Sequence, residues 1–243
     1  MPVKNYSALA LFYSHLMKSI NYKKWADYIF EISKEIKRKD LSVVELASGT
    51  GNVSVHLIKR FSSLLISDRS IAMLRQNENL SNYKVCFDMT DIPLKNKFDF
   101  VYSTFDSVNY LLTKEKFLKM LSAVNDILVT DGIYTFDVGL EKNSLRYQKY
   151  LNRKGRFQEI TFRQKSRFDP KLRLHYNYFD ITLADGTMVE EIHKQKIYEF
   201  EDYFNFIDES GLYVHKCLES FTWKDANKNS ERAQFILKKK KSC

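Results

Sequence analysis

The stretch Glu45-Leu46-Ala47-Ser48-Gly49-Thr50-Gly51 decides how this chain folds, because an apolar run enters it and a helical pattern leaves it. The run from Ser42 to Leu46 predicts a strand, and residues 53–61 predict a helix. Four of the seven residues in the stretch are Ala, Ser or Gly, as a loop needs where its backbone passes close to a ligand. The sequence therefore predicts a strand, a tight binding loop and a helix.

Strand and helix patterns alternate on both sides of this loop. Two helices are predicted before it, within residues 6–37, with a break near 19–21. The segments predicted after it are strands at 64–66, 83–87, 98–103, 133–138, 213–218 and 233–239, and helices at 70–77, 114–129 and 199–210. Such alternation is typical of parallel sheets with helices on both faces. We therefore expect an α/β fold: a Rossmann-like, doubly wound, mostly parallel seven-stranded sheet with an N-terminal helical cap.

The pattern changes after Gly139. A helical piece at 145–151 is followed by three long segments in which β-branched and aromatic residues alternate, at 157–168, 172–183 and 187–198. Turn signals at 169–171 and 185–186 join these segments. We expect residues 140–198 to form an inserted antiparallel β lid for the substrate, and residues 1–139 and 199–243 to form the ligand-binding domain.

Composition narrows the setting of the protein. The 243 residues are 44% hydrophobic, which is enough to bury a core. The three cysteines have no paired spacing, so we expect neither a disulfide framework nor a metal site. No signal segment or long uncharged apolar run is visible, which favours a cytoplasmic protein with no membrane partner.

The net charge of +9 raises the question of a nucleic-acid partner. The Lys and Arg residues are interleaved with 30 acidic residues, and the only dense run is Lys238 to Lys241. We interpret that run as a solvated tail, with contact to an anionic surface as the alternative. On this reading we expect no nucleic-acid partner and a monomer or homodimer.

Two acidic residues mark the ligand of the loop. Asp68 ends the second predicted strand, where an acid commonly binds ribose hydroxyls. Glu45 places a carboxylate at the end of the first strand, which would repel a pyrophosphate and attract an amino group. A nicotinamide dinucleotide remains an alternative, but about 40 residues of helix precede the first strand. S-adenosylmethionine fits both acids better.

Several segments carry a resemblance to a known family. They are residues 21–25, 44–52, 67–74, 88–89, 98–101, 105–110, 132–138 and 230–232. With them, the chain resembles class I S-adenosylmethionine-dependent methyltransferases, and within these the small-molecule group that includes sugar N-methyltransferases. The resemblance extends over nearly the whole chain and implies S-adenosyl-L-homocysteine as the product of the cofactor.

The resemblance also implies which residues contact the cofactor. The methionine part would lie on the loop and beside an aromatic ring, the ribose on Asp68, and the adenine after the third strand. The full expected set is Tyr22, Trp25, Glu45, Ala47, Gly49, Gly51, Asp68, Arg69, Met73, Asp88, Met89 and Phe105. The family usually has Asp followed by Gly-Cys-Gly, whereas this chain has Glu45 followed by Ala47-Ser48-Gly49, which narrows the pocket slightly.

Three residues are candidates for handling the acceptor. His193 lies in a lid segment that resembles the family's, and a neutral imidazole can take a proton from an attacking amine. Tyr110 follows the fourth strand, and Tyr13 belongs to the cap; each could instead be a packing residue.

These observations predict an enzyme that transfers a methyl group to a small-molecule N or O atom by in-line displacement. An RNA or protein acceptor, or a nicotinamide-dependent oxidoreductase, are the alternatives. No Asn/Asp-Pro-Pro-Tyr segment stands at 105–108, which argues against methylation of the amino groups of nucleic-acid bases.

Overall fold

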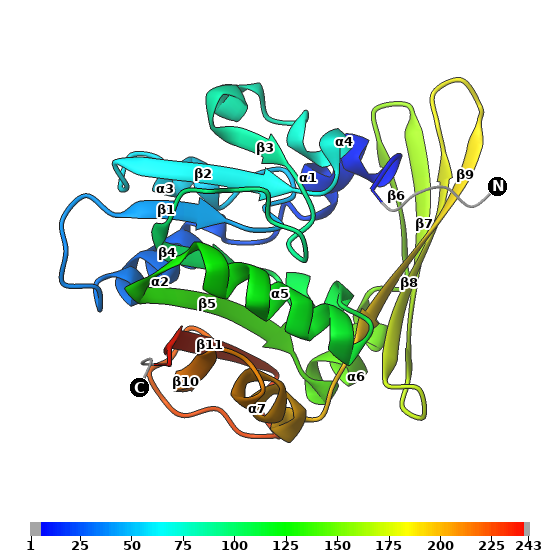
Figure 1. The fold of residues 1–243 in the computed structure, drawn as a ribbon. Coiled ribbons are helices and arrows are strands. Elements are labelled where there is room, and N and C mark those ends of the chain that lie inside the picture. The colour runs from blue at the N-terminus through cyan, green and yellow to red at the C-terminus, as the bar shows by residue number, and fades with distance from the viewer. Residues whose placement is uncertain (1–5, 241–243) are drawn as a thin grey trace.

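The computed structural model describes residues 6–240, and within them a seven-stranded sheet forms the body of the protein (Figure 1). Its strand order is β10-β11-β5-β4-β1-β2-β3. The strands are β1 (Ser42–Glu45), β2 (Ser63–Asp68), β3 (Lys84–Cys86), β4 (Phe98–Ser103), β5 (Leu128–Gly139), β10 (Leu212–Glu219) and β11 (Arg232–Lys239). Strands β1 to β5 pair in parallel, and β11 and β10 add antiparallel at one edge. The predicted sheet is confirmed.

Helices cover both faces of this sheet because side chains along the central strands alternate between two cores. Helices α5 (Lys114–Ile127) and α7 (Phe200–Asp208) cover one face, and α2 (Tyr22–Ser33) and α3 (Ser54–Leu57) cover the other (Figure 1). The alternation is plain in β4, where Val101 packs toward α5 while Phe100 and Tyr102 pack toward α2. The remaining helical pieces are η1 (Leu9–Phe12), α1 (Tyr13–Leu16), α4 (Ile71–Leu74), η2 (Glu78–Tyr83), η3 (Ser107–Tyr110) and α6 (Glu141–Tyr150).

Local capping explains where several helices begin. The Asn21 side chain accepts a hydrogen bond from the backbone N–H of Lys24 at the start of α2, and Ser70 caps α4 in the same way. The helix predicted at 70–77 is shorter than expected, because α4 ends at Leu74 and a separate 3₁₀ helix, η2, follows.

The insertion forms a separate antiparallel sheet in the order β6-β7-β8-β9. Its strands are β6 (Arg153–Phe157), β7 (Ile160–Asp169), β8 (Leu174–Thr182) and β9 (Met188–Lys196). The sequence predicted three strands here, and that count is wrong. The missed turn lies at Gln158 and Glu159, where Gln158 adopts a φ of 51° without the glycine or proline that would have marked it.

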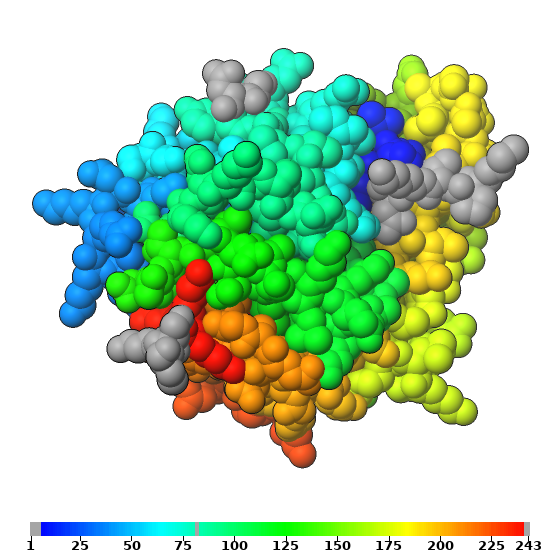
Figure 2. All heavy atoms as spheres, in the orientation of Figure 1, coloured from blue at the N-terminus to red at the C-terminus, as the bar shows by residue number. Residues whose placement is uncertain are grey.

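The small sheet stands across the carboxyl ends of the parallel strands (Figure 1). Part of its inner face packs on the N-terminal helices, and the rings of Phe162 and Phe12 stack with centroids 4.9 Å apart. In Figure 2 the blue N-terminal segment is visible where the cyan part of the main domain meets the yellow lid. The N-terminal segment therefore connects the two sheets.

The lysines near the C-terminus differ from expectation. Lys238 and Lys239 lie in β11 and pair with Tyr213 and Leu212 of β10, so the interpretation of this run as a solvated tail is wrong for these two residues. Lys241 and Cys243 lie outside the described residues. None of the helices within residues 6–240 has the length and apolar character needed to cross a membrane.

Candidate functional site

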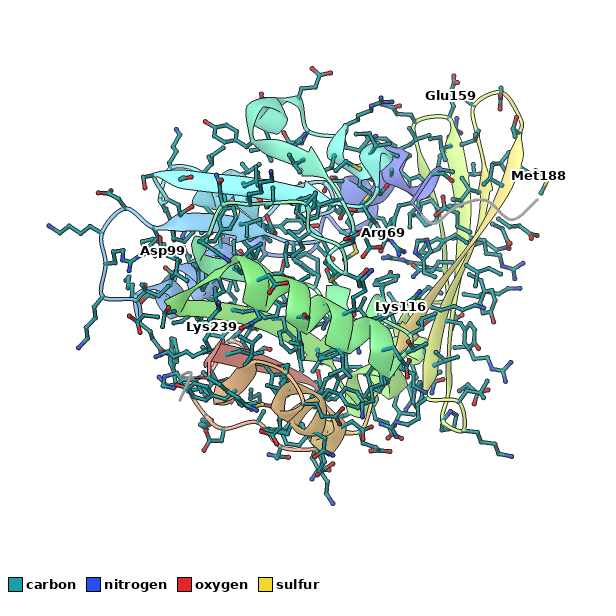
Figure 3. The ribbon with its side chains drawn as sticks, in the orientation of Figure 1. Arg69, Asp99, Lys116, Glu159, Met188 and Lys239 are labelled. Carbon is teal, nitrogen blue, oxygen red and sulfur yellow. The ribbon has the colours of Figure 1, made fainter. Side chains whose placement is uncertain are left out.

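A cavity of about 560 Å³ lies between the carboxyl ends of the parallel strands and the inner face of the lid. Thirteen of the residues singled out from the sequence line it: Tyr13, Tyr22, Trp25, Ala47, Gly49, Asp68, Arg69, Met73, Asp88, Met89, Phe105, Tyr110 and His193. Figure 3 shows the Arg69 side chain on the side of the sheet that faces the lid, while Asp99 lies at the opposite end of the strands. The fold thus gathers residues from distant segments around one space.

The loop after β1 forms the floor of the cavity. Ala47, Gly49 and Gly51 have φ angles of 54°, 60° and 74°, in the left-handed region that glycine adopts at least cost. A Cβ atom at Gly49 would lie 3.1 Å from Cε of Met73, so the absence of a side chain leaves space above the loop at this point. The hydroxyl of Ser48 is buried and has no hydrogen-bond partner within residues 6–240. The loop therefore offers backbone and one free hydroxyl to a ligand.

Gly51 has a different role from Gly49. It does not line the cavity, and a Cβ atom there would lie 2.6 Å from Cδ1 of Leu80. Gly51 thus allows Leu80 to pack closely behind the loop. The sequence predicted a cofactor contact for Gly51, but this residue does not line the cavity.

Asp68 ends β2 beside this loop and is 9% exposed. Its carboxylate accepts hydrogen bonds of 2.7 Å from the backbone N–H of Gly49 and of Ser70. Burial raises the pKa of Asp68 above its ordinary value, although these two hydrogen bonds act in the opposite direction. Each carboxylate oxygen keeps a further lone pair, so Asp68 can accept from a pair of ligand hydroxyls.

The segment after β3 forms the far wall of the same half of the cavity. Phe87 and Met89 supply apolar surface, and Asp88 lies 3.8 Å from the guanidinium of Arg69. The Asp88 carboxylate also accepts from the backbone and hydroxyl of Thr90, which fixes its direction. This wall can hold a flat, weakly polar group such as an adenine ring.

Glu45 is not in the cavity wall, which corrects the electrostatic role expected for it. Its side chain is 1% exposed and accepts a hydrogen bond from the hydroxyl of Ser54 beneath the loop. Burial raises the pKa of Glu45 to about 7, and the Ser54 hydrogen bond only partly offsets that effect. Glu45 therefore supports the loop from below, and its side chain does not line the cavity.

An aromatic wall rises where β4 ends. Phe105 stacks on Trp25 with ring centroids 4.4 Å apart, and the Tyr22 ring lies 5.5 Å from it. Phe105 and Asp106 both have positive φ angles, 60° and 48°, in a region that costs L-residues about 1 kcal/mol each. Strained backbone of this kind is held only where the surroundings fix it, and it turns the Phe105 ring toward the cavity.

Ion pairs and one hydrogen bond to the lid hold that strained turn. Arg232 bridges Asp106, at 2.8 Å, and Asp137. The amide of Gln195, on the lid, donates to the Asp106 carboxylate at 2.5 Å. The turn beside Phe105 is therefore tied both to the main sheet and to the lid.

Tyr6 closes the cavity between the two sheets, and the sequence analysis missed it. Its hydroxyl lies 2.6 Å from that of Tyr110, and its ring packs on those of Tyr13 and His193 at 5.9 and 4.5 Å. Tyr6 is one of 15 tyrosines, so nothing in the sequence marked it. Burial raises the pKa of Tyr6, Tyr13 and Tyr110, which keeps all three phenols protonated near neutral pH.

His193 and Glu191 form a buried pair on β9, with Nε2 of the histidine 3.0 Å from the carboxylate. Burial tends to raise the pKa of Glu191, but hydrogen bonds from His193 and from the backbone of Leu9 and Ala8 outweigh it and lower that pKa. An ionised carboxylate cannot donate, so Nε2 carries the proton of this hydrogen bond. Nδ1 is buried without a partner within the described residues.

The rest of the cavity is an acceptor chamber, which we define as the part lined by α6 and by the inner face of the lid. Its polar lining residues are Asn143, Ser144, Arg153, Gln164, His175, Asn177, His193 and Gln195. Burial lowers the pKa of His175, whose Nε2 lies 2.7 Å from the hydroxyl of Ser166. Within residues 6–240, no group of three or more His, Cys, Asp or Glu side chains is arranged to hold a metal ion.

Comparisons with known proteins agree with this geometry. A family described as "Methyltransferase domain" matches residues 43–132, the segment that carries the loop and Asp68. YqeM of Bacillus subtilis (strain 168), named only provisionally as a methyltransferase, is 26% identical over 246 residues that cover 98% of each chain. A protein of Geobacillus sp. (strain WCH70) with the same provisional name is 23% identical over 257 residues, covering 96% of this chain and 99% of its own.

Solved structures extend the likeness to the lid. An S-adenosylmethionine-dependent methyltransferase from Clostridium acetobutylicum ATCC 824 is 25% identical, with a TM-score of 0.78 over 97% of this chain and 99% of its own. The sugar N-methyltransferase KedS8 from Streptoalloteichus sp. ATCC 53650 shares the fold at 19% identity, with a TM-score of 0.74 over 95% of this chain and 92% of its own. The matches favour methyl transfer over the nicotinamide alternative. The chain therefore resembles S-adenosylmethionine-dependent methyltransferases along its length, and residues 43–132 match a methyltransferase domain.

Proposed function

We propose that this enzyme methylates an N or O atom of a small molecule held in the acceptor chamber, with His193 as the proton acceptor. The observation that carries the proposal is the position of His193 in the chamber wall, with Nε2 bonded to Glu191 and Nδ1 free. A histidine held in this tautomer presents a lone pair rather than a proton. It is suited to remove the proton that an attacking amine or hydroxyl must lose.

The cofactor half of the cavity fits S-adenosylmethionine. The free Ser48 hydroxyl and the space above Gly49 suit its methionine part, Asp68 suits its ribose, and residues 87–89 suit its adenine. When bound, S-adenosylmethionine supplies an electrophilic methyl group on a sulfonium. Phe105 and Trp25 place aromatic faces beside the position we assign to that cation, which favours its binding by cation–π attraction.

The protein's own part is alignment, exclusion of water and proton removal. We assign alignment to the chamber walls, exclusion of water to the lid (residues 140–198) with Tyr6, and proton removal to Nδ1 of His193. Tyr110 and Tyr13 stay protonated, so in this proposal they donate hydrogen bonds to the acceptor. The free thiols of Cys86 and Cys217 are consistent with the cytoplasmic setting that we propose.

Two measurements test the proposal. Thermal-shift or calorimetric titration with S-adenosylmethionine, S-adenosylhomocysteine, NAD and NADP should show binding of the first two compounds only. A panel of amines, sugars and phenols, assayed by release of S-adenosylhomocysteine, should then identify the acceptor. Binding of NAD without binding of the sulfonium compound would overturn the cofactor assignment.

An RNA acceptor is the second candidate, and one observation favours it. Arg163, Lys165 and Arg167 alternate along the exposed outer face of β7, next to the stacked rings of Tyr176 and Tyr178 on β8. Cations with aromatic rings on an open sheet are a common RNA-binding arrangement. Tight RNA binding that weakens steeply with salt, together with methylation of that RNA, would favour this candidate; methylation of panel compounds alone would exclude it.

A further inference from the structure

Arg153 is a cation without a counter-ion in the acceptor chamber. It begins β6, is half-buried and lines the cavity. Burial lowers its pKa, and no opposing contribution raises it. Among residues 6–240 no carboxylate forms an ion pair with this half-buried guanidinium group. This position can accept a negative group from a ligand, since the described protein supplies none.

Two other arginines of the molecule, Arg173 and Arg232, form ion pairs with carboxylates. Arg173 lies between Glu141, at 3.0 Å, and Glu199, at 2.6 Å. Arg232 lies between Asp106 and Asp137, and those carboxylates raise its pKa although burial acts to lower it. The protein thus balances each of these two guanidinium groups with two acids. Arg153 has no such acid, although it lines the acceptor chamber.

A hydrogen-bonded relay beside Arg153 extends the positive character of this wall. A guanidinium can only donate, so the side-chain oxygen of Gln164 must face Nε of Arg153, at 2.8 Å. Gln164 therefore turns its NH₂ group to the side-chain oxygen of Asn177, at 3.1 Å. The NH₂ group of Asn177 is left without an acceptor within the described residues. The relay fixes the orientation of both amides and leaves the NH₂ group of Asn177 as a free donor on this wall.

The free donors are arranged for an anionic oxygen group. Nη1 of Arg153 has no partner within residues 6–240, and Nη2 has only a long contact of 3.5 Å with the carbonyl of Leu16. Guanidinium groups bind carboxylate and phosphate oxygens through two parallel N–H donors. The neighbouring His175 stays neutral near pH 7, because burial lowers its pKa. It therefore does not compete with Arg153 for the negative charge.

We propose that Arg153 and Asn177 bind a carboxylate or phosphate group of the methyl acceptor, so that the substrate is a small anionic amine or alcohol. This inference rests on the proposed function of the chamber and narrows its substrate class. The anionic group binds at the wall formed by β6, β7 and β8, and the nucleophilic atom of the same molecule faces His193. Asn177 and His193 are paired across β8 and β9, which sets the two binding points side by side.

A direct binding experiment tests the site without knowledge of the natural acceptor. The protein, saturated with S-adenosylhomocysteine, is titrated with sodium phosphate or sodium acetate while the side-chain amide signals of Gln164 and Asn177 are followed by NMR. Sodium chloride and neutral acetamide serve as reference titrants. We expect saturable shifts with an anionic oxygen probe and none with the references; phosphate and acetate in separate arms distinguish the two chemical sources.

Matched variants make the result specific. Arg153→Gln should weaken binding of the anionic probe by about tenfold or more, the scale of losing a charge-assisted hydrogen bond. Gln164→Glu should do the same by giving Arg153 an internal counter-ion. Arg156→Gln removes the same charge from the exposed face of β6 and should leave probe binding unchanged. All three variants should still bind S-adenosylhomocysteine, which shows that they are folded.

The outcomes separate this inference from the function on which it rests. Absence of S-adenosylhomocysteine binding by the wild-type protein overturns the proposed function. Intact S-adenosylhomocysteine binding without saturable probe shifts overturns the anion site alone, and so do equal shifts in the wild type and Arg153→Gln. A panel in which each carboxylate or phosphate acceptor is paired with its neutral amide or ester should further show methylation of the anionic member.

Discussion

The cofactor half and the acceptor half of the cavity are built by opposite means. Much of the cofactor half comes from short segments at the ends of parallel strands, such as residues 47–49, 68–69 and 87–89, and helix α2 completes its aromatic wall. The acceptor half comes from alternate side chains of four antiparallel strands, so its neighbours in space are far apart in sequence. One half is therefore a property of short motifs, and the other is a property of strand register.

The two halves also differ in how their charged groups are satisfied. Asp68 accepts from two backbone N–H groups that belong to its own loops. Within the described residues, Nδ1 of His193 and Nη1 of Arg153 have no hydrogen-bond partner, and both residues line the chamber. In the cofactor half the two backbone partners fix the direction of the Asp68 carboxylate, whereas in the acceptor half the unpartnered donors and lone pairs select a ligand that complements them. We expect substitutions in the two halves to separate cofactor binding from turnover.

The largest effect is expected from His193→Gln in the acceptor half. Glutamine can still donate to Glu191 but offers no basic nitrogen, so kcat should fall by about 10²- to 10⁴-fold, the usual range for general base catalysis. The affinity for S-adenosylmethionine should not change. Steady-state kinetics with the acceptor found in the panel measures both values. His215→Gln, on β10 and paired with Glu35, is the control, and an unchanged kcat in His193→Gln would contradict the assignment.

Glu45→Gln tests the support beneath the loop through its pH dependence. The folded protein keeps a proton on Glu45 up to about pH 7, whereas the unfolded chain releases it near 4.5. Since the folded state binds more protons in this window, stability falls as the pH rises from 4.5 to about 7. Glutamine should remove that loss, which is on the order of 3 kcal/mol.

Urea unfolding of the wild type and Glu45→Gln between pH 5 and about 8 measures the free energy of unfolding. The difference should grow with pH and favour the variant at the upper end. Glu159→Gln, at the exposed turn between β6 and β7, is a matched control far from the loop (Figure 3). Parallel curves for wild type and Glu45→Gln would show that Glu45 is ionised in the folded protein.

Asp68→Ala tests the cofactor half. Loss of charge-assisted hydrogen bonds to the ribose should weaken S-adenosylmethionine binding by about tenfold to a hundredfold. Calorimetry gives the affinity directly, and circular dichroism checks that the fold is retained. Asp180→Ala, exposed on the outer face of the lid, should bind normally. Equal affinity in the wild type and Asp68→Ala would remove Asp68 from the ribose site.

Tyr110→Phe examines the boundary between the halves and should have the smallest effect. It removes the 2.6 Å contact with the Tyr6 hydroxyl, a neutral hydrogen bond whose net contribution is about 1 kcal/mol. We expect kcat/KM to fall by less than about tenfold, with an unchanged pH profile because the phenol does not ionise near neutral pH. A fall in kcat/KM as large as the fall in kcat for His193→Gln would identify Tyr110 as the base. Tyr213→Phe, exposed on β10, is the control.

The sequence was most informative where function depends on local backbone. The small residues of 47–51 and the acid at Asp68 predicted the cofactor half, because a loop near a ligand needs small residues whatever surrounds it. Glu45 was misplaced, since a carboxylate at a strand end can turn toward the ligand or under the loop, and only packing decides which. The turn at Gln158 was also missed, because its positive φ is adopted by a residue other than glycine, so the sequence carries no turn signal there.

By itself, then, the sequence determined the alternation of strands and helices in the main domain, the binding loop and the presence of an inserted antiparallel lid. The tertiary structure alone decided which lid residues meet: Arg153 with Gln164, Gln164 with Asn177, and His193 with Glu191. It also brought Tyr6 over the cavity, through the hydrogen bond from its backbone N–H to Glu191. The physical reason is that alternation along a strand determines which side chains lie on the same face of the sheet. The neighbours across strands depend instead on register and turns, and long-range packing fixes both.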